Sequence, residues 1–355
     1  ERFASDLLAS VLEGQGVEVT RGAFDLPTAF DARAGAGGPT VAICCEYDAL
    51  PGIGHACGHN VIAAAGLGAG LAAAAAADDA GGRVRILGTP AEEGGGGKVL
   101  MAERGAFEGV DAAMMVHPAG ADLATMDVIA AAMLDVEYHG RAAHAAAAPQ
   151  DGRNALDAAV LGYVNVAALR QHIRSTERVH GIFTRAGDKA NIVPDHTAAH
   201  WMVRAARAAS LPPLKERVLT CLQAGAAAAG CRMEHRPSAP DYADMVDNPA
   251  LLALYVANSG SLGRSVSATA TPDTRVVGST DMGNVSYLVP SIHPMIKVAP
   301  AGVGIHSSAF AGHARSPEAD RAVIDGAKAM ALTVADLWAR PGALDQVRAT
   351  FTPPT

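Results

Sequence analysis

Three short apolar runs, each followed by turn residues, constrain the fold of this chain more than any other feature. They cover residues 40–46, 83–88 and 111–116, and each is typical of a buried strand. Helical stretches lie between them, at 61–77 and 97–104. Strands that alternate with helices indicate a mostly parallel sheet covered by helices. The first part of the chain is therefore predicted to form an α/β domain.

A second order of elements occupies the middle of the chain. Strands are predicted at 134–139, 179–183, 197–204 and 231–235, and helices at 154–173 and 214–229. The order β-α-β-β-α-β is that of a ferredoxin-like α+β domain. We expect this domain to span residues 128–237 and to be inserted into the α/β domain, which would comprise residues 1–127 and 238–355.

Bulk composition limits the size of the domains, the molecules that the chain can bind and its expected location. The 355 residues, 50% of them hydrophobic, suffice for one large domain or two ordinary ones. The net charge is −8 without a block of like charge, so nucleic acid has no basic stripe to bind. The most apolar stretch, Val61–Ala77, is mostly alanine and is interpreted as a buried helix rather than a membrane span. An odd number of cysteines and no recognisable signal peptide favour a cytoplasmic location.

Side chains that carry chemistry are most concentrated at residues 46–60. This segment holds two carboxylates, two imidazoles and a thiol: Glu46, Asp48, His55, Cys57 and His59. Cysteine and histidine bind borderline transition metals such as zinc. A Cys-x-His pair in a glycine-rich loop can turn both ligands to one point. Structural zinc sites usually add a second Cys-x-x-Cys pair, which is absent here.

Two adjacent carboxylates, Glu92 and Glu93, follow the second apolar run. They repel each other unless a positive charge lies nearby, and a metal ion would supply it. One carboxylate can then bind metal while its neighbour transfers protons. The glycines at 94–97 let the backbone approach a ligand closely. A solvated acidic loop is the alternative interpretation.

Two histidines complete the set of candidate ligands. His117 follows the third apolar run, and His306 lies near the end of the chain. Either residue alone would be interpreted as structural. Because ligands gather at the carboxyl ends of parallel strands, we expect His117 to lie near Asp48 and the paired glutamates.

These segments resemble the family of co-catalytic metallopeptidases that contains aminoacylases, carboxypeptidase G and indole-acetyl-amino-acid hydrolases. The similarity is strongest to the branch of p-aminobenzoyl-glutamate hydrolases and Xaa-Arg dipeptidases. It rests on EYDALPGIGHACGHN at 46–60, GTPAEEGGGGK at 88–98, VHP at 116–118, HGRAAHAAAAPQDGRNALDA at 139–158, NIVPD at 191–195 and GSTDMGNVS at 278–286.

The resemblance implies a zinc-peptidase-like catalytic domain with an inserted dimerisation or lid domain. It also implies two divalent metal ions per subunit, zinc or manganese, with cobalt as a third candidate. Cys57 and His59 would bind metal, with the thiolate bridging both ions. Glu93 and His117 would each add a ligand, and His306 would complete the set. The ions would lower the pKa of water to about 7, which makes hydroxide available at neutral pH.

The resemblance assigns five further roles. Glu92 would be the general base and acid, and Asp48 would orient a ligand imidazole. His144 would stabilise the oxyanion from the partner subunit of a homodimer, with a heteromer as the alternative assembly. Asn191 and Arg204 would hold the substrate's carboxylate. The implied reaction is hydrolysis of the amide bond of an N-acyl amino acid, a dipeptide or p-aminobenzoyl-glutamate.

Several alternatives stay open at this stage. Many family members have a ligand histidine where this chain has Glu46, and His55 competes with His59. Asp281 lies in a polar loop and is a candidate for shaping the site. Two other functions remain: a cysteine amidase with Cys57 as nucleophile, and a non-catalytic binding or partner subunit. His144 has the alternative of an ordinary loop histidine.

Overall fold

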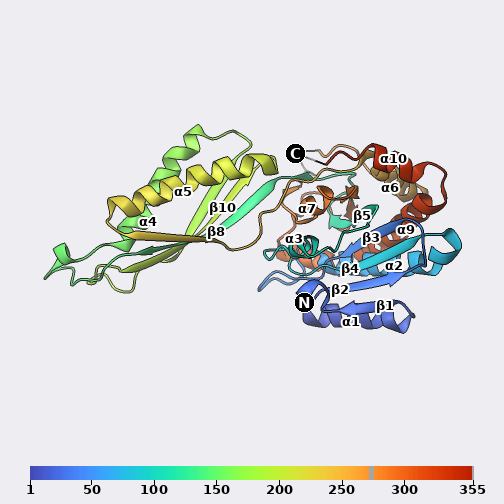
Figure 1. Ribbon diagram of the computed structural model, residues 1–355, viewed down its shortest axis with the longest axis horizontal. Coiled ribbons are helices and arrows are strands. Elements are labelled where there is room, and N and C mark those ends of the chain that lie inside the picture. Colours follow the sequence, from blue (N-terminus) through green and yellow to red (C-terminus); the bar gives the residue numbers. More distant parts are fainter. Residues whose placement is uncertain (272–275, 354–355) are drawn as a thin grey trace. The chain divides into compact units, whose positions relative to one another are not determined.

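A computed structural model describes residues 1–271 and 276–353 (Figure 1). The chain divides into two compact units, which are unit 1 (Glu1–Val128 and Met245–Thr355) and unit 2 (Ile129–Asp244). The second boundary lies seven residues later than the sequence predicts. Residues 238–244 stay with unit 2 because Ser238 N–H donates to the Met133 carbonyl (3.0 Å) and Tyr242 N–H to the Ala131 carbonyl (2.8 Å).

A six-stranded sheet organises the described part of unit 1. Its order is β1 (Glu18–Arg21), β2 (Phe30–Ala34), β4 (Arg83–Gly88), β3 (Thr40–Cys45), β5 (Ala112–Met114) and β13 (Ser291–Ile292). The run from β4 to β13 is parallel, as predicted, whereas β1 and β2 extend the sheet antiparallel. Two short parallel pairs accompany it, β6 (His117–Ala119) with β14 (Met295–Lys297) and β7 (Asp127–Val128) with β12 (Val277–Gly278).

Helices cover this sheet, and alternate residues of β3 show that both of its faces are buried. Val41 and Ile43 belong to one apolar cluster, and Ala42 and Cys44 belong to another, so both faces are buried. The helices are α1 (Arg2–Gly14), α2 (His59–Ala80), α3 (Gly97–Glu103), α6 (Pro249–Ser261), α7 (Met282–Ser286), α8 (Ser308–His313), α9 (Pro317–Ala339) and α10 (Ala343–Ala349).

The alanine-rich helix α2 lies unusually close to the sheet. A Cβ at Gly66 would lie 2.6 Å from Cys45 Sγ, and one at Gly70 would lie 2.5 Å from Ile86 Cγ1. By length and composition this helix is apolar enough to cross a membrane, and half of its most apolar window is buried inside the protein. Small side chains here permit close helix–sheet packing.

Unit 2 is an antiparallel sheet with two helices on one face (Figure 1). The strands lie in the order β11 (Arg232–Pro237), β8 (Ala130–His139), β10 (His196–Ala205) and β9 (Arg178–Arg185). The helices are α4 (Ala155–Leu169) and α5 (Leu211–Ala228). Along the chain this is the β-α-β-β-α-β order of a ferredoxin-like domain. Short 3₁₀ turns occur in the two units at Ala23–Asp25, Pro149–Asp151, Arg170–His172 and Ala208–Ser210.

The two faces of the unit 2 sheet differ in character. On β8, Leu134, Val136 and Tyr138 are buried under the helices, and the residues between them are partly exposed. The face opposite the helices, called the open face below, therefore carries the alternate polar positions of β8, β10 and β11.

Candidate metal centre and active site

Most candidate residues of unit 1 gather where its parallel strands end. Asp48 follows β3, Glu92 and Glu93 follow β4, and His117 begins β6 shortly after β5. This is the edge at which open α/β sheets bind ligands. The structure therefore brings together side chains that lie far apart in the sequence.

Gly58 shapes the turn that presents Cys57 and His59. Its φ is +83°, and a Cβ there would lie 2.4 Å from Pro118 Cγ. Only glycine accepts both the left-handed backbone and the close approach. Because Pro118 directly follows His117, this packing also joins two of the predicted ligand segments.

The predicted ligands form two groups that share one thiol. Cys57, His59 and His117 offer ligand atoms within 4.8 Å of one another, and so do Cys57, Glu93 and His306. Cys57 Sγ lies 3.4 Å from His117 Nε2, and Glu93 Oε2 lies 3.4 Å from His306 Nε2. Ligands of one tetrahedral zinc ion stand about 3.3–3.8 Å apart, given zinc–ligand bonds of about 2.0–2.3 Å. The donor set therefore fits two metal ions, and Cys57 is the residue that both groups share.

Hydrogen bonds hold two imidazoles in the tautomer that a ligand needs. His59 Nδ1 lies 2.8 Å from Asp48 Oδ1, and His117 Nδ1 lies 2.8 Å from the Pro118 carbonyl oxygen. Both Nδ1–H groups donate, so Nε2 is the nitrogen of each ring that would bind metal. His59 Nε2 is buried and makes no hydrogen bond within the described residues, and the same holds for Glu93 Oε1. A cation in each of the two ligand groups would satisfy both atoms.

The adjacent glutamates have opposite proton affinities. Burial, together with the negative charges of Glu46 and Asp281, raises the pKa of Glu92 well above its ordinary value. Burial is the largest influence on Glu93 and acts in the same sense. The hydrogen bonds to His306 and Cys57 and the charges of His59 and His306 together outweigh it, so the pKa of Glu93 is lowered. Glu92, whose proton affinity is raised, beside Glu93, whose proton affinity is lowered, matches the division between the group that transfers protons and the metal ligand.

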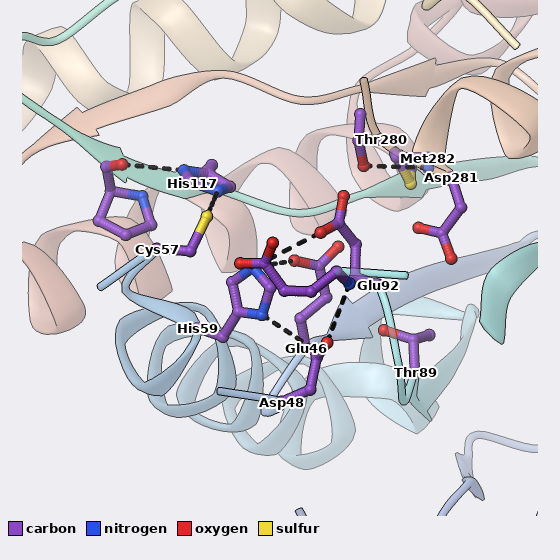
Figure 2. Close-up of polar contacts among 12 residues, drawn as sticks. Glu46, Asp48, Cys57, His59, Thr89, Glu92, His117, Thr280, Asp281 and Met282 are labelled. Carbon is purple, nitrogen blue, oxygen red and sulfur yellow. Dashed lines mark hydrogen bonds and ion pairs between the residues drawn. The ribbon is translucent and has the colours of Figure 1, made fainter. Parts of the chain in front are cut away.

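A buried ion cluster that the sequence did not predict lies behind the ligands. Lys98 Nζ lies 2.5 Å from Glu46 Oε1 and 2.5 Å from Asp281 Oδ1, and all three side chains are buried. Burial opposes the Lys98 charge, but Asp281 and Glu46 hold its pKa well above the usual range. Glu46 Oε2 in turn lies 3.4 Å from His59 Nε2 (Figure 2). Lys98 therefore holds Glu46 beside the ligand set. Glu46 and Asp281 were candidates from the sequence, but the lysine that joins them was not.

A second missed residue is His293, which is buried beside His117. The ring centroids are 5.4 Å apart, and neither His293 nitrogen has a hydrogen-bond partner within the described residues. Burial lowers the pKa of His293 to about 4, so its imidazole is neutral. His55, by contrast, belongs to none of the ligand groups of the described chain, and His59 takes the position for which the two competed.

His306 reaches the site through a strained backbone. Its φ is +64°, a left-handed value that is uncommon for residues other than glycine. Its N–H donates to the Ala56 carbonyl at 2.8 Å, which ties the loop of His306 to the loop of Cys57. Strain of this kind persists where surrounding contacts fix it and is concentrated at functional sites.

The environment of Cys57 argues against a cysteine amidase. Burial raises the pKa of its thiol to about 12, and the charges of Glu93 and Glu92 act in the same direction. A cysteine nucleophile needs the reverse, a thiol whose pKa is lowered. The protein's own groups thus keep Cys57 a thiol, and it becomes a good ligand when a cation offsets the carboxylates.

The three remaining predicted residues lie in unit 2. His144 and Asn191 are in two loops that pair, with Ala145 N–H donating to the Asn191 carbonyl at 3.0 Å. His144 Nδ1 accepts from the N–H groups of Ala146 and Ala147, both at 3.2 Å, so its Nε2 carries the proton. His144 thus presents an N–H donor at Nε2.

Arg204 lies on the open face of β10, away from these loops. Its Nε is buried and without a hydrogen-bond partner within the described residues, and burial lowers its pKa. Arg178 stands opposite it on β9. The guanidinium of Arg178 donates to the carbonyls of Ser175 and Glu177, so the unpartnered Nε of Arg204 is the group here that favours an anionic ligand.

Two ligand groups that share a thiol, beside a buried proton-carrying carboxylate, define a hydrolase that uses two metal ions to cleave amide bonds. Comparison with known proteins agrees. The chain belongs to peptidase family M20/M25/M40, whose family model matches residues 42–336. The Xaa-Arg dipeptidase of Mus musculus is 40% identical over 339 residues, which cover 92% of this chain and 78% of the relative. A subunit of the p-aminobenzoyl-glutamate hydrolase of Escherichia coli is 28% identical, over 98% of this chain and 87% of its own length.

Solved structures share the fold. The aminobenzoyl-glutamate utilization protein of Klebsiella pneumoniae superposes with a TM-score of 0.75 at 22% identity, over 96% of this chain and 91% of its own. A Bacillus subtilis protein described as a dinuclear metal-binding peptidase of this family gives a TM-score of 0.69 at 19% identity, over 95% and 92%. At these identities the likeness establishes the architecture alone.

Proposed function

We propose that this chain hydrolyses dipeptides or N-acyl amino acids that end in a free carboxylate, with Glu92 as general base. The observation that carries the proposal is the pair of ligand groups sharing Cys57, with Glu92 buried alongside. Cys57, His59, Glu93, His117 and His306 would hold two divalent ions. When bound, such ions lower the pKa of water and polarise the amide carbonyl.

Glu92 would transfer the protons of the reaction. Its raised pKa suits a carboxylate that accepts a proton from the attacking water and returns it to the leaving nitrogen. Lys98 and Asp281 would hold this environment in place from behind. Zinc, manganese and cobalt remain the candidate metals, and the thiol favours zinc among them.

Unit 2 would bind the substrate and the oxyanion. Arg204, with Arg178 beside it, offers positive charge for a carboxylate, and Asn191 would add a hydrogen bond. The Nε2–H of His144 would donate to the oxyanion. The relatives are named as a dipeptidase for Xaa-Arg and a hydrolase of p-aminobenzoyl-glutamate. Hydrolysis of either of these substrates releases an amino acid.

We also propose that unit 2 pairs with a second copy of itself. The outer strand β9 exposes Ile182 and Phe183, which are 65% and 39% exposed, and α4 exposes Val160, Leu161 and Val164. An edge strand with apolar side chains pairs readily with another chain. The homodimer would let His144 serve the active site of the partner subunit, and pairing with a related chain is the heteromeric alternative.

A substrate panel with controlled metal content tests this function. Chelator-treated protein should lose amide hydrolysis, and zinc, manganese or cobalt should restore it. Xaa-Arg dipeptides, N-acyl amino acids and p-aminobenzoyl-glutamate should be compared with the same compounds as carboxamides, which Arg204 would bind weakly. Full activity in verified metal-free protein would refute the two-metal assignment. No hydrolysis by metal-loaded protein, with activity appearing only on addition of a related chain, would favour the partner-subunit alternative.

Subunit complementation tests the role of His144. His144→Ala and Glu92→Ala should each be inactive alone. A mixed dimer has one site with both residues intact, so random exchange of equal amounts should restore roughly a quarter of wild-type activity. Verified exchange without any recovery would place His144 in its own subunit's site or outside catalysis.

A further inference from the structure

A cluster of two imidazoles and two carboxylates lies on the open face of the unit 2 sheet, remote in sequence from the Cys57 ligand groups. Its members are Glu137 and His139 on β8, His196 on β10 and Glu234 on β11. We propose that these four side chains bind one further divalent transition-metal ion, with zinc as the best fit. Imidazole and carboxylate are ligands that zinc accepts in tetrahedral sites.

The spacing of the ligand atoms supports a single ion. Glu137 Oε2 lies 2.8 Å from His196 Nε2 and 3.8 Å from His139 Nε2, and the latter lies 3.5 Å from Glu234 Oε2. Four ligands at zinc distances of about 2.0–2.2 Å stand about 3.3–3.6 Å apart in a tetrahedron. Glu137, His139 and His196 offer ligand atoms within 4.8 Å of one another, so these three would form the core of the site. Glu234 lies 3.5 Å from His139 Nε2 and would supply the fourth ligand by a rotation of its exposed side chain.

One atom of the cluster needs a partner. His139 Nε2 is shielded from solvent and makes no hydrogen bond within the described residues, although carboxylate oxygens lie just beyond hydrogen-bonding distance. Buried imidazole nitrogens are normally satisfied. An ion at the centre would satisfy His139 and would replace the hydrogen bond between His196 Nε2 and Glu137 Oε2, with the proton of His196 placed on Nδ1.

One neighbouring cation competes for the cluster. Arg232 forms an ion pair with Oε1 of Glu234. The other oxygen of Glu234 is the one that faces His139, so Glu234 can bind both. Arg232 is exposed and can turn away at little cost.

The sheet fixes the positions of the four side chains. His139 stands opposite His196 on one side and Arg232 on the other, and Glu137 stands opposite Glu234. The imidazoles of His139 and His196 stack with centroids 5.1 Å apart. The ligands therefore come from three hydrogen-bonded strands, and little ordering entropy is lost when an ion binds.

The position suggests what the ion does. His139 ends β8 just before the loop that carries His144, and His196 begins β10 just after the loop that carries Asn191. Gly140 N–H, directly after His139, donates to the Asp195 carbonyl at 2.7 Å. An ion bound there would hold together the end of β8 and the start of β10, from which the two loops extend. This consequence rests on the proposed function, whereas the binding itself does not.

Metal content of the full chain tests the proposal. Wild-type protein, His139→Ala and the matched control His200→Ala would each be saturated with zinc, passed through gel filtration in metal-free buffer and analysed for zinc. His200 lies on the same open face and pairs with Asp135 at 3.0 Å, outside the cluster. His139→Ala should hold about one ion fewer than wild type, and His200→Ala should hold the same number.

Cobalt substitution identifies which ion is lost. The absorption difference between wild type and His139→Ala should show ligand-field bands without a sulfur-to-cobalt charge-transfer band, because the cluster contains no thiol. Equal zinc content in wild type and His139→Ala would overturn the proposal, as would a difference spectrum with thiolate character. The Cys57 groups are tested separately, since their failure would lower the total in both proteins and leave the difference of one ion intact.

Discussion

The two units handle charge in opposite ways. In unit 1, Lys98, Glu46 and Asp281 are fully buried and depend on one another. On the open face of unit 2, Arg236 lies 3.3 Å from Asp135, but it is 74% exposed and water can replace either partner. Buried charges must be matched by neighbouring charges, whereas exposed pairs contribute little. We therefore expect the loss of a single buried charge to destabilise unit 1 strongly, and the loss of an exposed charge on the open face to change the stability of unit 2 very little.

The largest expected effect belongs to the base. Glu92→Gln should lower kcat about 10³-fold, because it removes the proton acceptor and no predicted ligand. Metal content should stay near that of wild type. Steady-state kinetics and elemental analysis measure the two effects.

Glu93→Gln is the matched control for this substitution. It changes the neighbouring carboxylate in the same way but should also lower metal content, because Glu93 shares a ligand group with Cys57 and His306, whereas Glu92 groups with Glu46 and His59 and not with the thiol. If Glu92→Gln were the variant that loses metal, the two roles would be reversed.

The comparison between the units is tested most directly by removing one cation from each. Lys98→Met should destabilise unit 1 by about 3–5 kcal/mol, because it leaves buried carboxylates without a counter-charge. Arg236→Met should cost less than about 0.5 kcal/mol, because its partner stays solvated and keeps His200. Urea unfolding measures both. Similar small losses of stability in the two variants would contradict the difference between buried and exposed charges.

A moderate effect is expected where the open face is predicted to bind substrate. Arg204→Met should raise KM about 10-fold to 100-fold, as expected when a charged hydrogen bond is lost, with a smaller change in kcat. The carboxamide of the same substrate should show no such sensitivity. Arg207, which is 75% exposed, supplies the control Arg207→Met, for which KM should not change.

The smallest expected effect concerns pH. Burial raises the pKa of Asp247 from 3.8 to about 7, although the side chain accepts a hydrogen bond from the His293 N–H at 3.4 Å. The folded state therefore holds a proton that the unfolded state releases, so this contribution to stability is present below about pH 4 and is lost as pH rises towards 7. Asp247→Asn should be more stable than wild type by about 1 kcal/mol at pH 8, a modest figure because the side chain keeps some contact with water.

Thermal unfolding between pH 5 and 8 measures this difference. Exposed Asp79→Asn controls for the loss of one negative charge. A stability gain for Asp247→Asn that is larger at pH 5 than at pH 8 would contradict the sign of the argument.

Elements with strong local patterns were predictable. The strand predicted at 40–46 is β3 (Thr40–Cys45), and the helical stretch at 61–77 lies within α2 (His59–Ala80), because burial on both sides leaves a continuous apolar signature. The antiparallel pair β1 and β2 carried no such signature, since β1 is mostly exposed and short. The last strand of the sheet, β13, has two residues and is also invisible to periodicity.

By itself, the sequence determined which chemistry the chain carries. The thiol, imidazoles and carboxylates stand in short motifs whose spacing follows local backbone geometry, such as the turn at Gly58 between Cys57 and His59. Tertiary structure alone decided the partners of these groups. Lys98 meets Glu46 from 52 positions away and Asp281 from 183 positions away, and His139 meets His196 through strand register. Such contacts depend on how the whole chain packs, because electrostatic and metal-binding interactions act over distance in space and leave no periodic trace along the sequence.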